Sequence, residues 1–251
     1  MRKAFVAVWL VASTVILSFF ALFIALFGDR QETIHRLARL WARMYLTVAG
    51  IEVRVEGLER VMSPPYVFMC NHQSALDIYA LLARLPVSFK WIAKRQLFAI
   101  PVFGWAIRKA GYISIDRENA REALKAIEEA SRRIREGANI IIFPEGTRSA
   151  DGGLLPFKKG GFTLALRAMV PIVPLGIYGS SRLQPKGSSL PRKKGVIYIE
   201  IGDPMALEGM DRSQKTRVMD DVRASIEALM ARGVKAQAEV EGRVAGRRDR
   251  I

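Results

Sequence analysis

The pattern of apolar and charged positions changes near residue 50. Residues 4–27 carry no charge, and an α-helix of that length reaches about 36 Å, enough to cross a hydrocarbon core of about 30 Å. Residues 33–50 instead repeat apolar and basic residues at helical spacing. One face holds Ile34, Leu37, Trp41, Met44, Tyr45 and Val48, and another holds Arg36, Arg39 and Arg43. This pattern predicts an apolar membrane segment followed by a basic amphipathic helix at a bilayer interface.

Each of these two N-terminal segments has an alternative interpretation. The alternative for residues 4–27 is a cleaved signal peptide. This fits less well than a membrane segment, because the apolar run exceeds the usual ~7 to 15 residues and is followed by GDRQE, which is not a small-residue cleavage site. Residues 33–50 also suit a surface helix packed on its own domain. In the membrane interpretation, we expect His35 to be an interfacial side chain without chemistry.

From residue 51 onward, short β-branched or aromatic runs alternate with amphipathic helical patterns. The predicted strands are 51–55, 66–70, 112–115, 139–143, 172–178 and 196–201, and the predicted helices are 75–85, 96–110, 118–137 and 159–169. Most of these strands are continuously apolar, which indicates burial on both faces. The alternation therefore predicts an α/β fold with a mostly parallel sheet covered by helices. Pro171 and Pro174 favour a bent edge strand for the fifth run.

These patterns divide the chain into three parts. Residues 1–50 form the membrane anchor, 51–232 an α/β domain, and 233–251 a basic tail with little apolar periodicity, which we expect to be disordered. Within the α/β domain, residues 180–195 are rich in Pro, Gly, Ser and basic residues, which predicts a loop.

Charge and cysteine content narrow the classes of function. The chain has 39 Lys and Arg against 24 Asp and Glu, a formal charge of +15, which implies an anionic partner: nucleic acid, a membrane surface or a phosphorylated ligand. The anchor favours the membrane. A single cysteine, Cys70, excludes an internal disulfide or a multi-cysteine zinc site and fits a buried thiol in a reducing compartment.

The stretch NHQSALD, residues 71–77, follows the predicted strand 66–70. Ser74 and Asp77 fit a helix-capping pattern that needs no chemistry, but this does not account for His72. If the His72 ring reaches Asp77 across the first helical turn, a carboxylate on Nδ1 leaves Nε2 as a general base. Without a paired Ser or Cys nucleophile, such a pair suits deprotonation of a substrate hydroxyl.

The stretch FPEGTRS, residues 143–149, follows the predicted strand 139–143. Gly146 permits close approach of a ligand to the backbone, and Thr147 and Arg148 offer donors that match phosphate oxygens. Arg117 follows a further predicted strand, and the carboxyl ends of parallel strands share one edge. The pattern predicts an anion pocket there; a solvated turn is the alternative. Glu145 fits such a pocket if it accepts from hydroxyls or orients an arginine.

Together these motifs resemble those of the glycerolipid acyltransferases, in particular the bacterial lysophosphatidic acid acyltransferases. NHQSALD is similar to that family's NHxSxxD block, and FPEGTRS to its third block. GYISIDR (111–117) and VPIVPLGI (170–177) resemble the second and fourth blocks, in the same order, across roughly residues 55–204. Ser114 departs from the second block, where a large apolar residue is common.

The resemblance implies transfer of a fatty acyl group from acyl-CoA or acyl carrier protein to the sn-2 hydroxyl of 1-acylglycerol 3-phosphate. The product is phosphatidic acid, and no metal or bound cofactor is required. His72 becomes the catalytic base and Asp77 its partner. The expected substrate-binding residues are Lys94, Arg117, Glu145, Gly146, Thr147 and Arg148.

Two other functions remain open at this point. The acceptor of the same reaction could be another lysolipid, such as a lyso-ornithine lipid or a lysophospholipid, in which case the basic residues would be dispensable. A membrane-bound protein that binds nucleic acid or a lipid surface would use the charge but has no need of a histidine beside a carboxylate. We expect membrane lipids, lysophosphatidic acid and the thioester donor as partners, and no nucleic acid.

The charges beside residues 4–27 bear on location. Arg2 and Lys3 precede the apolar run and Arg30 follows it, so orientation rules favour keeping both flanks in the cytoplasm. We expect a bacterial inner-membrane protein whose catalytic domain lies on the cytoplasmic side. In this interpretation the anchor dips into one leaflet while Arg36, Arg39 and Arg43 extend to headgroups; a single span is the alternative.

Overall fold

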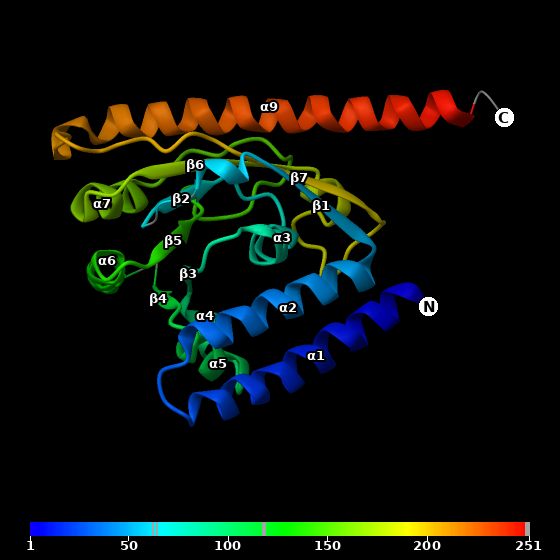
Figure 1. Cartoon of the computed structure of the whole chain (residues 1–251), viewed down its shortest axis with the longest axis horizontal. Coiled ribbons are helices and arrows are strands. Elements are labelled where there is room, and N and C mark those ends of the chain that lie inside the picture. The colour runs from blue at the N-terminus through cyan, green and yellow to red at the C-terminus, as the bar shows by residue number, and fades with distance from the viewer. Residues whose placement is uncertain (62, 64, 117–118, 249–251) are drawn as a thin grey trace.

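A seven-stranded sheet forms the centre of the molecule in the computed structural model, which describes residues 1–61, 63, 65–116 and 119–248 (Figure 1). The strands are β1 (Ile51–Glu56), β2 (Val67–Cys70), β3 (Phe89–Lys94), β4 (Ile113–Ile115), β5 (Asn139–Ile142), β6 (Ile172–Tyr178) and β7 (Gly195–Ile201). Their order is β1-β7-β6-β2-β5-β3-β4. All neighbours pair in parallel except β6 and β7. The carboxyl ends of β6, β2, β5, β3 and β4 therefore share one edge, and the predicted α/β fold is confirmed.

Helices cover both faces of this sheet (Figure 1). The longer helices are α1 (Arg2–Ala25), α2 (Gln31–Ala49), α3 (Leu76–Arg84), α5 (Phe103–Lys109), α6 (Ala120–Arg135), α7 (Lys159–Ala168) and α9 (Lys215–Arg248). Single turns form α4 (Arg95–Phe98), α8 (Ser180–Leu183), η1 (Leu58–Arg60) and η2 (Arg212–Gln214). Helices α2 and α3 lie on one face with α1 outside them, and α6, α7 and α9 lie on the other.

Strand β2 shows why the strands are continuously apolar. Successive side chains of a strand point to opposite faces. Accordingly, Val67 and Met69 lie in the core beneath α6, α7 and α9, while Phe68 and Cys70 lie in the core beneath α2 and α3. All four are fully buried. Burial on both faces requires apolar residues at every position, and this accounts for the sequence pattern.

Two strand expectations differ from the structure. Strand β3 was not predicted, because Lys90 interrupts its apolar pattern; this lysine is buried, and its ammonium group donates to the Ala110 carbonyl at 2.9 Å. The run that contains Pro174 is not an edge strand, since β6 lies between β7 and β2. Pairing of β6 with β7 begins only at Leu175, so the proline nitrogen, which has no hydrogen to donate, falls at the end of that ladder.

Two helix expectations also need correction. The predicted helix 96–110 is divided into α4 and α5, with Pro101 between them, because a proline removes a backbone donor and clashes with the preceding turn. The tail 233–251 was expected to be disordered, but α9 continues without interruption to Arg248. The helix crosses the boundary drawn at residue 232.

The apolar face of α2 packs against its own domain. Tyr45 is buried beside Tyr79 of α3, with ring centroids 4.4 Å apart. Arg39 and Arg43 donate to the carbonyls of Leu85 and Ala83, at the carboxyl end of α3, where cations are favoured by the helix dipole. The surface-helix alternative therefore holds for α2, and these two arginines do not extend to headgroups.

His35 is also not interfacial. Its side chain is fully buried, edge-on to Phe89 with ring centroids 4.8 Å apart, and neither ring nitrogen has a hydrogen-bond partner among the described residues. Burial, reinforced by the positive charge of Lys90, lowers the pKa of His35 to about 4. The imidazole is therefore neutral at physiological pH.

Candidate active site

The predicted pair of His72 and Asp77 forms at the carboxyl end of β2. Nδ1 of His72 lies 2.9 Å from Oδ2 of Asp77, which stands in the first turn of α3. The Asp77 side chain is fully buried and the His72 side chain is 14% exposed. A carboxylate on Nδ1 fixes the tautomer in which Nε2 carries the lone pair, so the solvent-facing ring can accept a proton.

The backbone of the turn wraps around the same carboxylate. Oδ2 of Asp77 also accepts from the N–H groups of Gln73 and Ser74, both at 2.8 Å. Ser74 is not the N-cap residue, which is Ala75; its hydroxyl accepts from Leu76 N and donates to the Gln184 carbonyl. Asp77 therefore shapes the turn that carries His72 as well as orienting its ring.

Glu145 connects the second motif to this turn. Its Oε1 accepts from the backbone N–H of His72 at 2.6 Å, and its Oε2 accepts from Leu155 N at 2.9 Å. The residue is buried, and burial raises the pKa of its carboxyl group, although both N–H groups act in the opposite direction. Ser149 N donates in turn to the His72 carbonyl. In this geometry both carboxylate oxygens of Glu145 bind the backbone, and the residue holds the His72 turn in place.

An aromatic stack supports the catalytic ring. The His72 ring lies on Phe143, with centroids 3.8 Å apart and planes 13° apart. Phe143 in turn stacks on Trp91 of β3 at 5.6 Å. Stacked rings prefer such offset parallel arrangements, and a ring face also attracts a cation. The stack therefore restricts the orientation of His72.

A cavity of about 600 Å³ opens beside His72. Four of the predicted binding residues line it: Lys94, Gly146, Thr147 and Arg148. Lys186, from the predicted loop 180–195, also lines it; the basic composition of that loop was the only signal for it. Among the residues that the structure describes, none of the three cations pairs with a carboxylate. Arg117 lies outside the described residues.

The backbone conformation at position 146 favours glycine. Its φ is +71°, in the left-handed region that favours glycine, and a Cβ there would lie 3.0 Å from the side chain of Lys158. After this tight turn, Thr147 and Arg148 line the same cavity as His72.

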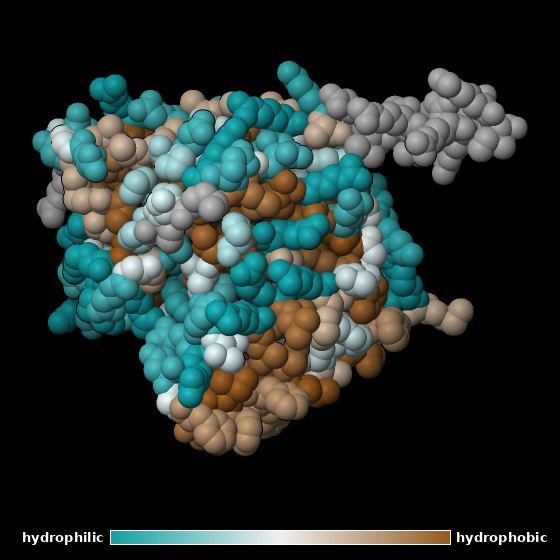
Figure 2. Space-filling view, in the orientation of Figure 1, coloured by the Kyte–Doolittle hydropathy of each residue, from teal (hydrophilic) through white to brown (hydrophobic). Residues whose placement is uncertain are grey.

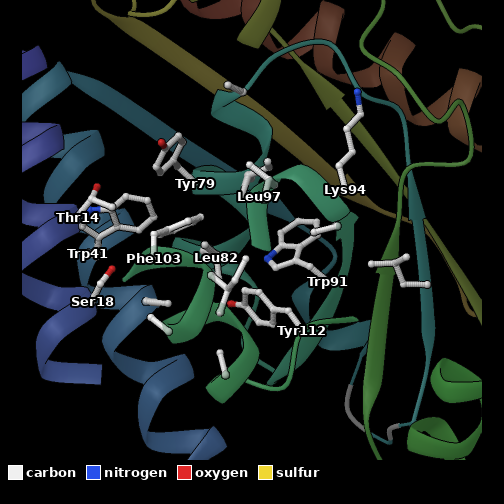
Figure 3. Close-up of a pocket in the computed structure, with 18 of the residues that line it drawn as sticks. Thr14, Ser18, Trp41, Tyr79, Leu82, Trp91, Lys94, Leu97, Phe103 and Tyr112 are labelled. Atoms are coloured by element: carbon white, nitrogen blue, oxygen red, sulfur yellow. The ribbon is translucent and has the colours of Figure 1, made fainter. Parts of the chain in front are cut away.

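The rest of the cavity is mostly apolar, apart from polar side chains such as Thr14 and Ser18 of α1, and extends beneath the N-terminal helices (Figure 3). Its lining includes Leu17 of α1, Leu37 and Trp41 of α2, Leu82 of α3, Trp91 of β3 and Phe103 of α5. Trp41 also donates to Ser13 of α1 at 3.2 Å, which links the two helices. The segment predicted as a separate anchor thus supplies one wall of the cavity, a contribution that no local pattern signals.

Among the described residues, no group of three or more His, Cys, Asp and Glu side chains is arranged to hold a metal ion. Cys70 is buried beneath the site, and burial raises the pKa of its thiol. His72, in contrast, is partly exposed, has the Asp77 carboxylate on Nδ1 and can accept a proton on Nε2.

Comparison with known proteins agrees with this geometry. A solved 1-acyl-sn-glycerophosphate acyltransferase from Thermotoga maritima superimposes with a TM-score of 0.74 at 26% identity, covering 92% of this chain and 96% of that one. A chloroplast 1-acyl-sn-glycerol-3-phosphate acyltransferase of Brassica napus is 38% identical over 186 residues, which are 73% of this chain and 54% of the relative. The human alpha enzyme of the same name is 35% identical over 181 residues, covering 70% and 63%.

The match spans about half the length of the chloroplast relative. The family model described as Acyltransferase matches residues 52–178, which contain both motifs and the strands β1 to β6. The chain therefore belongs to the acyltransferase family.

Proposed function

We propose that this protein transfers a fatty acyl group from a thioester to the sn-2 hydroxyl of 1-acylglycerol 3-phosphate, forming phosphatidic acid. The observation that carries the proposal is the His72–Asp77 pair at a mostly apolar cavity that is also lined by Lys94, Arg148 and Lys186, which have no carboxylate partner among the described residues. A proton acceptor, a chain-sized apolar space and an anion-binding rim are what the two substrates require. The names of the relatives support the same acceptor.

In this mechanism Nε2 of His72 accepts the proton of the acceptor hydroxyl as its oxygen attacks the thioester carbonyl carbon. The C–O bond forms, the tetrahedral intermediate collapses, and the C–S bond breaks. The thiolate leaves readily because a thiol has a pKa of about 8.5, and His72 returns the proton to it. Asp77 stabilises the transient imidazolium through Nδ1.

Arg148, Lys94 and Lys186 are proposed to bind the acceptor phosphate, with Gly146 and Thr147 shaping that rim. A guanidinium presents a planar fork that matches phosphate oxygens, whereas an ammonium acts as a point charge. The assignment of Arg117 to the same role rests on its motif alone. The donor is acyl-CoA or acyl carrier protein, and the reaction as proposed uses no resident metal or cofactor.

The chain is proposed to reside at the cytoplasmic face of a bacterial inner membrane, anchored in one leaflet by α1. By length and composition α1 is able to cross a membrane, and its outward side chains are large and apolar, including Phe19, Phe20 and Phe23. However, α1 packs on α2 and α5 and lines the cavity through Leu17. This packing holds the helix to the domain and favours a position along one leaflet over a free span.

A transfer assay with the full-length protein tests the proposal. Several lysolipids, with and without a phosphate monoester, are offered with acyl-CoA and with acyl carrier protein. Arg148→Ala should lower kcat/KM for the phosphate acceptor by roughly 10- to 100-fold, since hydrogen bonds to charged groups contribute about 1.5–3 kcal/mol. Arg148→Lys should recover little of it, and donor KM should not change.

Arg217→Ala on α9, whose side chain is 74% exposed and distant in sequence from the site motifs, is the matched control. Equal kcat/KM of the parent protein for acceptors with and without the phosphate would contradict the proposed acceptor and favour another lysolipid.

A further inference from the structure

The turn between α4 and α5 presents large apolar side chains to solvent. Leu97 is 37% exposed, Ile100 45% and Trp105 56%. We refer to residues 97–105 as the α4–α5 corner. Scattered single apolar residues are common on surfaces, but several within one short turn indicate an interaction site.

The corner is held rigidly from behind. Phe98 is buried, and its carbonyl accepts from Arg108 at 3.0 Å. A Cβ on Gly104 would lie 2.3 Å from that same carbonyl oxygen, so only glycine fits there. Val102 has a φ of +63°, which is strained for a β-branched residue. The apolar side chains are therefore displayed by a fixed turn and not by a loose loop.

The corner adjoins the outward face of α1. On its inner side α5 places Ala106 and Ala110 against Ala21 of α1, in one buried cluster. The lower part of Figure 2, over α1 and α5, is accordingly a continuous apolar surface. The cations Lys94 and Lys109, both exposed, flank the corner along the chain. Exposed apolar side chains, a tryptophan among them, between flanking cations are a pattern typical of a bilayer interface.

The corner also forms part of the cavity wall. Leu97 and Phe103 line the cavity, whereas their neighbours Ile100 and Trp105 are exposed. One thin turn thus separates the cavity from whatever covers the outer surface. If the outer surface of this turn faced only water, its apolar side chains would be exposed to water, which is unfavourable for several of them grouped together.

We propose that the α4–α5 corner is a second lipid-contacting element, which enters the same leaflet as α1. This contact sets the cavity wall against the hydrocarbon and allows the acyl tail of a membrane-resident acceptor to enter beside Leu97 and Phe103. The inference rests on the proposed function, since it needs a lipid acceptor and an anchor in α1. The three exposed side chains are too few for a stable protein interface, which usually buries at least about 1,200 Å².

Depth of insertion tests the proposal directly. Three variants of the full-length protein each carry one added cysteine with an environment-sensitive fluorophore: Ile100→Cys, Phe20→Cys on α1, and Leu124→Cys on α6, which is 43% exposed. The parent, whose only thiol is the buried Cys70, is the labelling blank. In anionic vesicles with quenchers on the acyl chains, emission at positions 20 and 100 should fall at least about twofold, and emission at position 124 should not change.

If position 20 is quenched and position 100 behaves like position 124, the inference is wrong while the α1 anchor stands. If neither position 20 nor position 100 is quenched, the anchor fails and the inference fails with it. If acyl carrier protein, in the absence of vesicles, prevented labelling of the cysteine at position 100, the corner would be assigned to a protein partner and the lipid assignment would be overturned.

Activity provides an independent readout. Ile100→Asp and Trp105→Asp should lower kcat/KM about tenfold for a long-chain acceptor in vesicles, and should leave kcat/KM unchanged for a short-chain acceptor dissolved as monomers. Leu124→Asp is the matched control and should affect neither. Because these positions are exposed, thermal unfolding midpoints should stay close to the parent value. An equal loss with both forms of acceptor would overturn the proposal.

Discussion

The two histidines of this chain occupy opposite kinds of environment. His72 stands at a strand end with Nδ1 on a buried carboxylate, one ring face on Phe143 and access to the cavity. His35 stands inside the core with both nitrogens unpaired among the described residues. A chain of aromatic rings, Phe143, Trp91 and Phe89, connects the two.

The difference shows what converts an imidazole into a base. Burial alone stabilises the neutral ring and leaves nothing for it to exchange protons with, which is the condition of His35. A carboxylate on one nitrogen, with the other nitrogen open, stabilises the charged ring at the place where a substrate arrives, which is the condition of His72. The following predictions test this contrast, beginning with the largest effect.

Replacing His72 by Ala should lower kcat by roughly 10²- to 10⁴-fold, about 3 to 5 kcal/mol of activation free energy, because it removes the group that is proposed to accept the hydroxyl proton. His35→Leu should leave kcat close to the parent value. Initial rates of acyl transfer measure both. A correctly folded His72→Ala protein with near-parental turnover would falsify the assignment of the base.

Replacing Asp77 by Asn should lower kcat by about 10²-fold or more, since a neutral amide cannot stabilise the imidazolium as a carboxylate does. The side-chain oxygen of Asn still accepts from the turn N–H groups, so the thermal unfolding midpoint should change less than the rate. Retention of kcat in this variant would show that Asp77 serves only to shape the turn.

The pH dependence of stability should show that His35 is buried and neutral in the folded chain. The unfolded chain protonates this residue below about pH 6.5, whereas the folded chain does so only near pH 4. The free energy of unfolding should therefore decrease as the pH falls through this window, and the loss due to His35 reaches about 3 kcal/mol near pH 4. The unfolding midpoint of His35→Leu should decrease less between pH 7 and pH 4 than that of the parent. Parallel curves for the two proteins would contradict the buried, neutral state.

Replacing Phe143 by Leu should lower kcat about two- to tenfold, in line with the 0.5–1.5 kcal/mol that a stacked pair contributes, while acceptor KM changes little. Trp91→Phe is the matched control, because it keeps an aromatic ring beside Phe143; it loses one of the two fused rings and an N–H without a partner among the described residues. A larger loss in Trp91→Phe than in Phe143→Leu would mean that the tryptophan acts through the cavity wall and not through the stack.

Local sequence patterns predicted much of the fold and the catalytic pair. Continuous apolar runs located five of the seven strands, because burial on both faces allows few polar residues, and alternation of apolar and polar residues located β1. They missed β3, where a lysine donates to a buried carbonyl 20 residues away, and they misjudged β6, where Pro174 lies in an internal strand. His72 and Asp77 were predictable because they lie only five residues apart, on either side of the start of α3.

Other features depended on contacts between distant parts of the chain. Glu145 was expected to bind substrate, but its carboxylate meets the backbone of His72, 73 residues away in sequence. Lys186 reaches the cavity from a loop with no motif of its own.

The sequence by itself determined six of the seven strands, the edge at which the polar motifs meet, and the pairing of His72 with Asp77. These follow from residue spacing over short stretches of chain and from the rule that parallel strands end together. The tertiary structure alone decided that α1 and α2 wall the cavity, that His35 is buried and neutral, and that the α4–α5 corner faces outward. Each of these depends on which surfaces pack together across long stretches of chain, and spacing within one element carries no information about that packing.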